Sequence, residues 1–226
     1  MKLETYIGKK TSNLTEREDI EWANFWIDRA NTDSSDRILL IGDSTSRIIR
    51  STFSRLADRP VDLLATSSSL HDELFINQVN AFFMQTKYTY KAIFVQLGHH
   101  AVYDVGGHDY QETDYQIFEE EYSLFVDYLK QYTSNVILET VLLTVKPYKH
   151  FSMFLRKFRV KETLDEEANY VKVRKNQIIQ KIAVEKNTAF CDMCNIMLKE
   201  KFVHIDHIHY EKAAFPVIVK NLMKFI

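Results

Sequence analysis

Three short segments of the 226-residue chain carry side chains that can take part in nucleophilic catalysis. They are Gly42-Asp43-Ser44, Gly98-His99-His100 and Asp206-His207-Ile208-His209. A serine hydroxyl is a weak nucleophile until a neighbouring base removes its proton, and histidine titrates near the pH at which such a base is needed. A carboxylate can hold the histidine in the required tautomer. These residue types favour acyl transfer, provided that folding brings the segments together.

The first segment lies where a strand is expected to turn into a helix. The stretch 37–50, RILLIGDSTSRIIR, contains four consecutive apolar residues, which is typical of a strand buried on both faces. Gly42 is expected to allow a sharp turn, and the polar residues after it are common helix caps. Ser44 is therefore expected at the carboxyl end of a parallel strand and at the positive end of a helix, where open α/β sheets bind ligands and anions.

The rest of the chain alternates between strand and helix patterns. Strands are expected at 61–66, 91–97, 135–143 and 188–192, and helices at 74–83, 118–132, 166–186 and 211–225. This alternation predicts a three-layer α/β/α domain with a parallel five-stranded sheet in flavodoxin-like order. The other two chemical segments then follow a strand or precede the last helix, at the edge of the sheet where active sites form.

A single domain is expected over 1–226, with an N-terminal helical extension over about 1–36. Within it, residues 14–30 fit a helix, because Ile20, Ala23, Trp26 and Ile27 form an apolar stripe. Thr15 and Glu18 fit a capping box at its start.

Composition and charge narrow the class of protein. Hydrophobic residues make up 46% of the chain and the net charge is −2, so a globular fold and no general attraction to nucleic acid are expected. No apolar run is long enough for a membrane span or a signal-peptide core, so a cytoplasmic location away from membranes is expected. Neither a Walker loop nor a G-x-G-x-x-G motif occurs, and no cofactor is expected.

A serine in a GDS motif near the N-terminus and a D-x-x-H motif near the C-terminus resemble the SGNH, or GDSL-like, hydrolase family. The resemblance runs from about Arg37 to the end of the chain. It implies that Ser44 is the nucleophile, that His209 is its general base and that Asp206 orients His209. It also implies an oxyanion hole made of the Ser44 backbone N–H, a glycine N–H after the second strand and an asparagine side chain.

The sequence departs from that family pattern at two oxyanion positions. The glycine position is occupied by Ser69, or by Ser68, and a backbone N–H survives this change. The asparagine position is occupied by His100, whose neutral imidazole can still donate one hydrogen bond. Asp43 and His99 are further candidates for contacts with substrate.

Other interpretations of the same residues remain open at this point. Ser44 could cap a helix rather than react. The cluster of His204, Asp206, His207 and His209 could bind a metal ion, although its spacing matches no established zinc site, and no metal is expected. Cys191 and Cys194 form one C-x-x-C pair, which we interpret as two ordinary thiols.

Residues 144–165 combine basic and aromatic side chains and are long for a connection. They could form a lid or an acceptor groove that binds sugar faces and acidic groups, with Tyr148 as a candidate substrate contact. We favour the alternative of an amphipathic surface helix whose aromatic side chains pack on the core, because Phe151, Phe154, Leu155 and Phe158 share one helical face.

The expected function is hydrolysis of a small O-acyl ester through an acyl-serine intermediate, with a small molecule or an O-acetylated carbohydrate as substrate. An O-acetyltransferase that modifies a sugar is the first alternative, since the residues that react cannot tell water from a sugar hydroxyl as acceptor. A non-catalytic carbohydrate-binding module is the second. The oligomeric state is left open.

Overall fold

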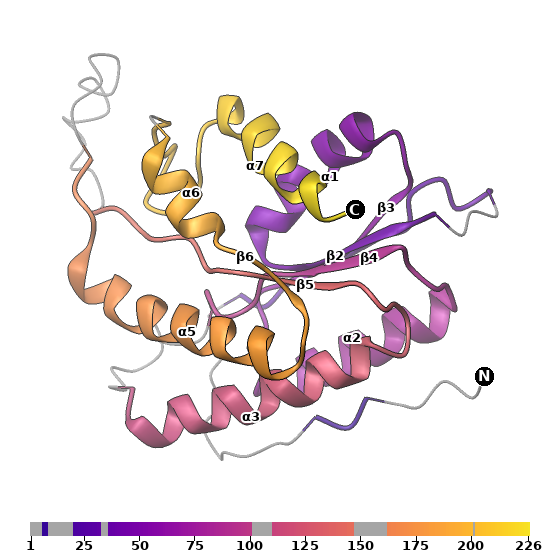
Figure 1. Ribbon diagram of the computed structural model, residues 1–226, viewed down its shortest axis with the longest axis horizontal. Coiled ribbons are helices and arrows are strands. Elements are labelled where there is room, and N and C mark those ends of the chain that lie inside the picture. The colour runs from indigo at the N-terminus through magenta and orange to yellow at the C-terminus, as the bar shows by residue number, and fades with distance from the viewer. Residues whose placement is uncertain (1–5, 9–19, 33–35, 101–109, 147–161, 201) are drawn as a thin grey trace.

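The apolar run after Arg37 forms a central strand of a six-stranded sheet that lies between two layers of helices (Figure 1). The computed structural model describes residues 6–8, 20–32, 36–100, 110–146, 162–200 and 202–226. Within those ranges, none of the helices combines the length and the apolar character that crossing a membrane requires.

Strands and helices alternate along most of the chain. The strands are β1 (Ala23–Trp26), β2 (Ile38–Gly42), β3 (Val61–Thr66), β4 (Ala92–Val95), β5 (Val136–Glu139) and β6 (Ala189–Cys191). The helices are α1 (Ser44–Ala57), α2 (Glu73–Thr86), α3 (Glu112–Leu129), α5 (Glu166–Glu185), α6 (Met193–Lys199) and α7 (Phe215–Leu222), with short 3₁₀ turns at Lys212–Ala214 and Met223–Phe225. The helix α6 was not predicted; the other elements from β2 onward match predicted ones, with some ends shifted by several residues.

The sheet has the order β1-β3-β2-β4-β5-β6, and every pair from β3 to β6 is parallel. These five strands have the predicted flavodoxin-like order, so the three-layer fold is confirmed. The predicted number of strands was one too low, because β1 pairs antiparallel with the outer edge of β3, with Ala23 opposite Thr66 and Trp26 opposite Leu63.

The predicted helix over 14–30 is wrong for the part that the structure describes. Residues 23–26 form β1, and the described residues of the segment 1–36 contain no helix; residues 9–19 lie outside the described part. The apolar stripe that suggested a helix is largely exposed, with Ile20 75% and Trp26 53% exposed. The residues that pack on the two cores are instead Phe25 and Trp22, which lie off that stripe. Residues 23–26 form a strand rather than a helix because they pair with β3, about 40 residues further along the chain.

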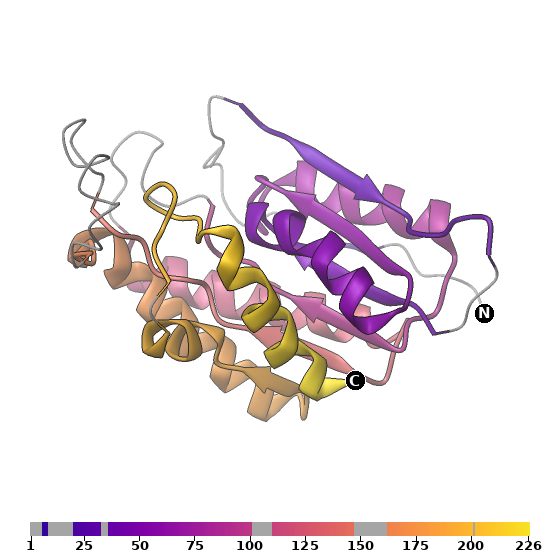
Figure 2. The ribbon, with the colours of Figure 1, turned by 90° about the horizontal axis from the view of Figure 1, so that it is seen from above.

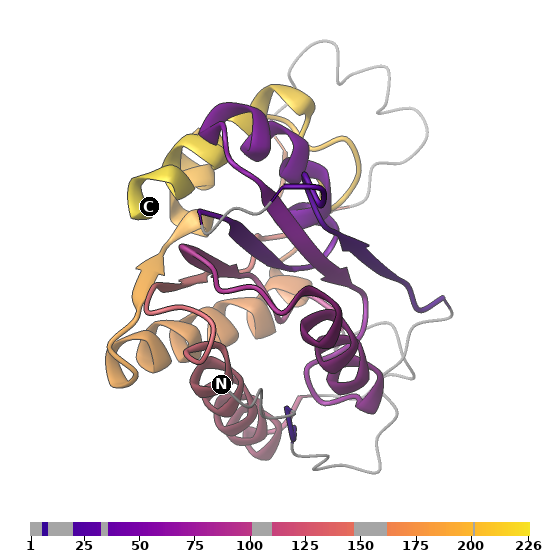
Figure 3. The same cartoon turned by 90° about the vertical axis from the view of Figure 1, so that its right-hand side faces the viewer.

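Helices cover both faces of the sheet, as Figures 1 and 3 show, and each face has its own hydrophobic core. On one face, Leu39 and Ile41 of β2 pack with residues from α2, α3 and α5. On the other, Ile38 and Leu40 pack with residues from α1, α6 and α7. Because helices cover both faces of the sheet, consecutive residues of β2 are all apolar.

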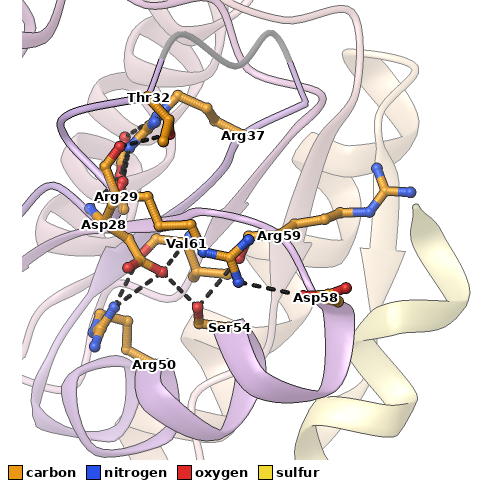
Figure 4. Close-up of polar contacts among 10 residues, drawn as sticks. Asp28, Arg29, Thr32, Arg37, Arg50, Ser54, Asp58, Arg59 and Val61 are labelled. Carbon is orange, nitrogen blue, oxygen red and sulfur yellow. Dashed lines mark hydrogen bonds and ion pairs between the residues drawn. The ribbon is translucent and has the colours of Figure 1, made fainter.

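A polar network ties β1 to the rest of the domain at the amino-terminal end of β3 (Figure 4). The Asp28 carboxylate, just after β1, accepts hydrogen bonds from the Ser54 hydroxyl in α1 and from the Val61 backbone N–H. Behind it, Arg37 and Asp62 form a fully buried ion pair. The turn after β1 is thus fixed to both α1 and β3.

Candidate active site

Ser44 is the first residue of α1, and the residue before it provides the helix cap. Asp43 is the N-cap, and its carboxylate accepts a hydrogen bond of 2.7 Å from the Thr45 backbone N–H. The capping interpretation of Ser44 is therefore wrong, because Asp43 fills that role. The Ser44 hydroxyl lies at the positive end of the helix and is not needed as its cap, so it can bind a different residue.

Gly42 matters for a different reason from the predicted one. It is the last residue of β2, and among the described glycines a positive φ occurs at Gly98 rather than here. A Cβ at Gly42 would overlap the side chain of Ser46 and would lie 2.9 Å from the carbonyl oxygen of Gln96. The glycine thus lets the first turn of α1 approach the neighbouring strand closely, and this approach sets the position of Ser44.

Ser44, His209 and Asp206 form a chain of two short contacts. Ser44 Oγ lies 2.6 Å from His209 Nε2, and His209 Nδ1 lies 2.7 Å from Asp206 Oδ2. Ser44 is buried, whereas the His209 side chain retains 23% of its surface exposure. The structure therefore brings together the three residues that the sequence motifs singled out.

The loop before the 3₁₀ turn at Lys212–Ala214 shapes the acidic end of this chain. Asp206 Oδ1 accepts hydrogen bonds of 2.7 Å from the backbone N–H groups of Ile208 and His209. Partial burial alone would raise the pKa of Asp206, but hydrogen bonds from the backbone and ring of His209 and from Ile208 outweigh it, so the pKa is lowered. An ionised Asp206 accepts the Nδ1 proton of His209, which leaves Nε2 to accept the proton of Ser44.

Most of the other predicted site residues line one pocket, which Asp43, the neighbour of Ser44 in the chain, also lines. The lining residues are Asp43, Thr66, Ser68, Ser69, Leu70, His71, Leu97, Gly98, His99, His100, Phe118 and Lys175. Both alternatives for the glycine position, Ser68 and Ser69, are among them. Tyr148 lies outside the described residues, as does the whole stretch 147–161.

The loop that follows β4 is held by a buried lysine. Lys175, from α5, is 2% exposed and donates a hydrogen bond of 3.2 Å to the Gly98 carbonyl oxygen. Gly98 has φ +116°, and a Cβ there would lie 3.3 Å from the ring of Phe118. The loop places the rings of His99 and His100 with their centroids 5.4 Å apart.

Burial lowers the pKa of His99 well below its ordinary value. The positive charge of Lys172 lowers it further, so His99 is neutral at pH 7.

The structure places the candidate metal ligands with other partners. His204 Nδ1 lies 2.6 Å from Glu162 Oε2, while Asp206 contacts His209. Within the described residues, no group of three or more histidine, cysteine, aspartate or glutamate side chains is arranged to hold a metal ion. Cys191 and Cys194 are free buried thiols, and burial raises their pKa values to about 12 and about 11.

Comparisons with known proteins agree with this architecture. No family model and no curated protein sequence matches the chain. Among solved structures, a protein from Slackia heliotrinireducens assigned to the SGNH hydrolases superposes with a TM-score of 0.58 at 12% identity, covering 85% of this chain and 99% of its own. The fold is that of the SGNH hydrolases. The resemblance first seen in the two short motifs is thus confirmed at the level of the fold.

Two further structures with the SGNH fold are named as acetyl xylan esterases. One, AlAXEase, has a TM-score of 0.56 at 13% identity and covers 83% of this chain and 98% of its own. The other is a variant of Axe2 from Geobacillus stearothermophilus, with a TM-score of 0.56 at 11% identity, covering 84% of this chain and 94% of its own. At such low identity the likeness concerns the fold.

Three features around the site in this SGNH fold were missed from the sequence. Lys175 reaches the pocket from the middle of a long helix, and only the tertiary fold shows that it points inward. His71 Nδ1 contacts the Glu121 carboxylate in a buried pair at the pocket wall. Trp22 lies with its ring centroid 6.3 Å from that of His100. A tryptophan in a polar N-terminal segment was a weak sequence signal for Trp22. The sequence gave no signal for Lys175 or for the pair of His71 and Glu121.

Proposed function

We propose that this protein is a serine esterase that hydrolyses small O-acyl esters, with O-acetyl groups on carbohydrates as the preferred class. The observation that carries the proposal is the contact of 2.6 Å between Ser44 Oγ and His209 Nε2, continued at 2.7 Å to Asp206. The names of two similar structures, both acetyl xylan esterases, support the choice of acetyl esters.

In the first half of the proposed reaction, Ser44 Oγ attacks the ester carbonyl carbon while its proton passes to His209 Nε2. Asp206 stabilises the imidazolium that forms. The negative oxygen of the tetrahedral intermediate accepts hydrogen bonds from the backbone N–H groups of Ser44 and Ser69 and from the His100 ring. Each such donor is worth about 3 kcal/mol of transition-state stabilisation. His209 then protonates the leaving alcohol oxygen, and the acyl group stays on Ser44.

In the second half, water takes the place of the alcohol. His209 removes a proton from the water, whose oxygen attacks the acyl carbon and forms a second tetrahedral intermediate. When this intermediate collapses, the bond to Ser44 Oγ breaks and Oγ takes back the proton from His209. The acid is released and the enzyme returns to its starting state.

The most direct test is to treat the folded protein with a fluorophosphonate and to locate the adduct by mass spectrometry. We expect labelling of Ser44, and no labelling at this position in Ser44→Ala. We also expect acid release from p-nitrophenyl acetate that is lost in Ser44→Ala. Thr45→Ala, which removes a neighbouring hydroxyl, is the matched control and should still be labelled. An unlabelled Ser44 in the folded wild-type protein would contradict the proposal.

The O-acetyltransferase alternative depended on the basic and aromatic stretch at 144–165. Most of that stretch lies outside the described residues, so no observation favours a sugar acceptor over water. A transferase would hydrolyse p-nitrophenyl acetate slowly and would form an acetylated sugar only when donor and acceptor are both present. A non-catalytic module would do neither.

A further inference from the structure

The additional strand β1 brings an aromatic residue to the rim of the proposed active site. The Trp22 backbone N–H donates to Ser67 Oγ at 2.9 Å, and the Trp22 carbonyl accepts from the Ser67 backbone N–H and from Thr66 Oγ1, both at 3.1 Å. These bonds fix Trp22 to the end of β3, immediately before Ser68 and Ser69. These bonds involve only the Trp22 backbone; its partly buried ring packs against the core and contacts the ring of His100.

The guanidinium of the exposed residue Arg47 lies over the Trp22 ring. The Arg47 guanidinium carbon lies 5.1 Å from the centroid of the Trp22 ring, within the range of a cation–π contact. Arg47 follows Ser44 by three residues on α1, so their Cβ atoms lie on one face of the helix, about 5–6 Å apart. The Trp22 ring therefore contacts both the Arg47 guanidinium and the ring of His100.

Arg47 forms no ion pair with any residue that the structure describes. The acidic groups around the site have other partners: Glu21 accepts hydrogen bonds from Ser67 and Ser68, and Asp206 accepts the His209 ring N–H. The N–H groups of a guanidinium lie in its own plane, so a contact of its face with an aromatic ring leaves two of them able to bind one carboxylate.

Two lysines of α5 add buried positive charge near His99, in a pocket whose lining also includes the carboxylate of Asp43. Lys172 and Lys175 of α5 are 7% and 2% exposed, and both contribute to the electrostatic field at His99. These two lysines attract a carboxylate on the substrate, as Arg47 does.

We propose that Trp22 and Arg47 form a subsite that binds a carboxylate on the alcohol part of the ester, so that the substrate class is O-acetylated acidic sugars. This proposal rests on the proposed esterase function and narrows its substrate. In this arrangement the carboxylate accepts two hydrogen bonds from Arg47, while Trp22 holds the guanidinium in place. The acetyl group then lies over Ser44, one helical turn away.

A binding experiment tests the subsite without requiring turnover. The probes are the fully O-acetylated methyl glycoside of glucuronic acid and its neutral methyl ester, titrated into Ser44→Ala protein by calorimetry. We expect the acid to bind at least tenfold more tightly than the methyl ester. Adding Arg47→Gln should abolish this preference, and Arg47→Lys should keep only part of it, because a lysine cannot bind the carboxylate with two parallel hydrogen bonds.

Two controls separate the subsite from a general effect of charge. Arg55→Gln removes the same charge from an exposed position in the last turn of α1 and should leave the preference for the acid unchanged. Trp22→Leu should reduce the preference several-fold, and Trp22→Phe should reduce it less, because phenylalanine keeps an aromatic face. Equal affinity for acid and ester, or a preference that survives Arg47→Gln, would overturn the proposal.

The outcome is distinguishable from a failure of the proposed esterase. Labelling of Ser44 together with equal affinity for the two probes would leave the esterase standing and remove the subsite. A preference that depends on Arg47, without labelling or hydrolysis by the wild-type protein, would leave the subsite standing and remove the esterase.

Discussion

Ser44 and His209 are 165 positions apart in the chain, yet their reactive atoms lie 2.6 Å from each other. Ser44 starts α1, and His209 lies in the loop just before the 3₁₀ turn that leads into α7. The two helices pack side by side on the same face of the sheet, as Figure 2 shows from above. The distance between hydroxyl and imidazole is therefore set by the packing of α1 against α7 rather than by local sequence.

Asp206→Asn tests whether the acidic residue controls the tautomer of His209. The asparagine oxygen can still accept from the backbone N–H groups of Ile208 and His209, so the loop should keep its shape. The amide NH₂ would then face Nδ1 and favour the tautomer with its proton on Nε2, which cannot accept the proton of Ser44. We expect kcat/KM for p-nitrophenyl acetate to fall about 10³- to 10⁴-fold with little change in Tm. A loss smaller than tenfold would mean that Asp206 does not orient His209.

The parallel strands were predictable because burial on both faces leaves a continuous apolar run. The apolar run at 38–41, for example, predicted a strand, and the structure has β2 at Ile38–Gly42. The serine at the end of β2 followed from the same pattern, since a parallel sheet offers only one edge for such a site. The loop containing His209 was predictable in position, but its distance from Ser44 depended on packing between distant helices.

The N-terminal strand and the inward lysine were not predictable in the same way. Ala23 and Trp26 fit a helical stripe as well as a strand, and pairing with β3 decided between them. Lys175 resembles any surface lysine in sequence, and only the packing of α5 against the Gly98 loop makes it buried. Long-range contacts of this kind leave no local pattern.

Glu139 is expected to make the protein less stable as the pH rises. It is the last residue of β5 and is 4% exposed. Burial, with the nearby Asp43 carboxylate, raises its pKa from 4.5 to about 8. Between these two values the folded protein holds a proton that the unfolded chain has lost, so stability falls as the pH rises through that window. Glu139→Gln should therefore be more stable than wild type at pH 8, by about 1–3 kcal/mol, with the difference vanishing near pH 4.

Urea unfolding at a series of pH values measures this effect. Glu185→Gln, at the exposed end of α5, is the matched control and should show no comparable pH trend relative to wild type. If the difference in unfolding free energy between Glu139→Gln and wild type stayed constant from pH 4 to pH 8, Glu139 would not be protonated in the folded protein across that range.

Arg37→Met should be strongly destabilising because it leaves a buried charge without its partner. Arg37 Nε lies 2.9 Å from Asp62 Oδ2, and both side chains are fully buried. Loss of one member of such a pair costs about 3–5 kcal/mol. Asp62→Asn added to Arg37→Met should recover part of that loss, since asparagine is neutral and can still accept the Asp28 backbone N–H that Asp62 now accepts. Denaturant unfolding of the single and double variants compares them; a double variant no more stable than Arg37→Met would contradict the explanation.

Gly98→Ala should lower both stability and activity, because the loop that carries His99 and His100 would have to move. At φ +116° an L-residue is strained by about 1–3 kcal/mol, and the added Cβ would press on Phe118 at 3.3 Å. The carbonyl of Gly98 would also shift away from Lys175. We expect a Tm several degrees lower and a kcat for p-nitrophenyl acetate lowered tenfold or more, measured well below that Tm.

Lys175→Met separates the position of the loop from the strain at Gly98. Methionine keeps the unbranched stem against Phe118 but cannot donate to the Gly98 carbonyl, so the loop would lose its anchor without a backbone clash. If the loop positions a donor for the oxyanion, kcat should fall in this variant too, while KM changes less. A Gly98→Ala protein that loses stability but keeps its full kcat, together with an unaffected Lys175→Met, would show that the loop supports the fold and not the reaction.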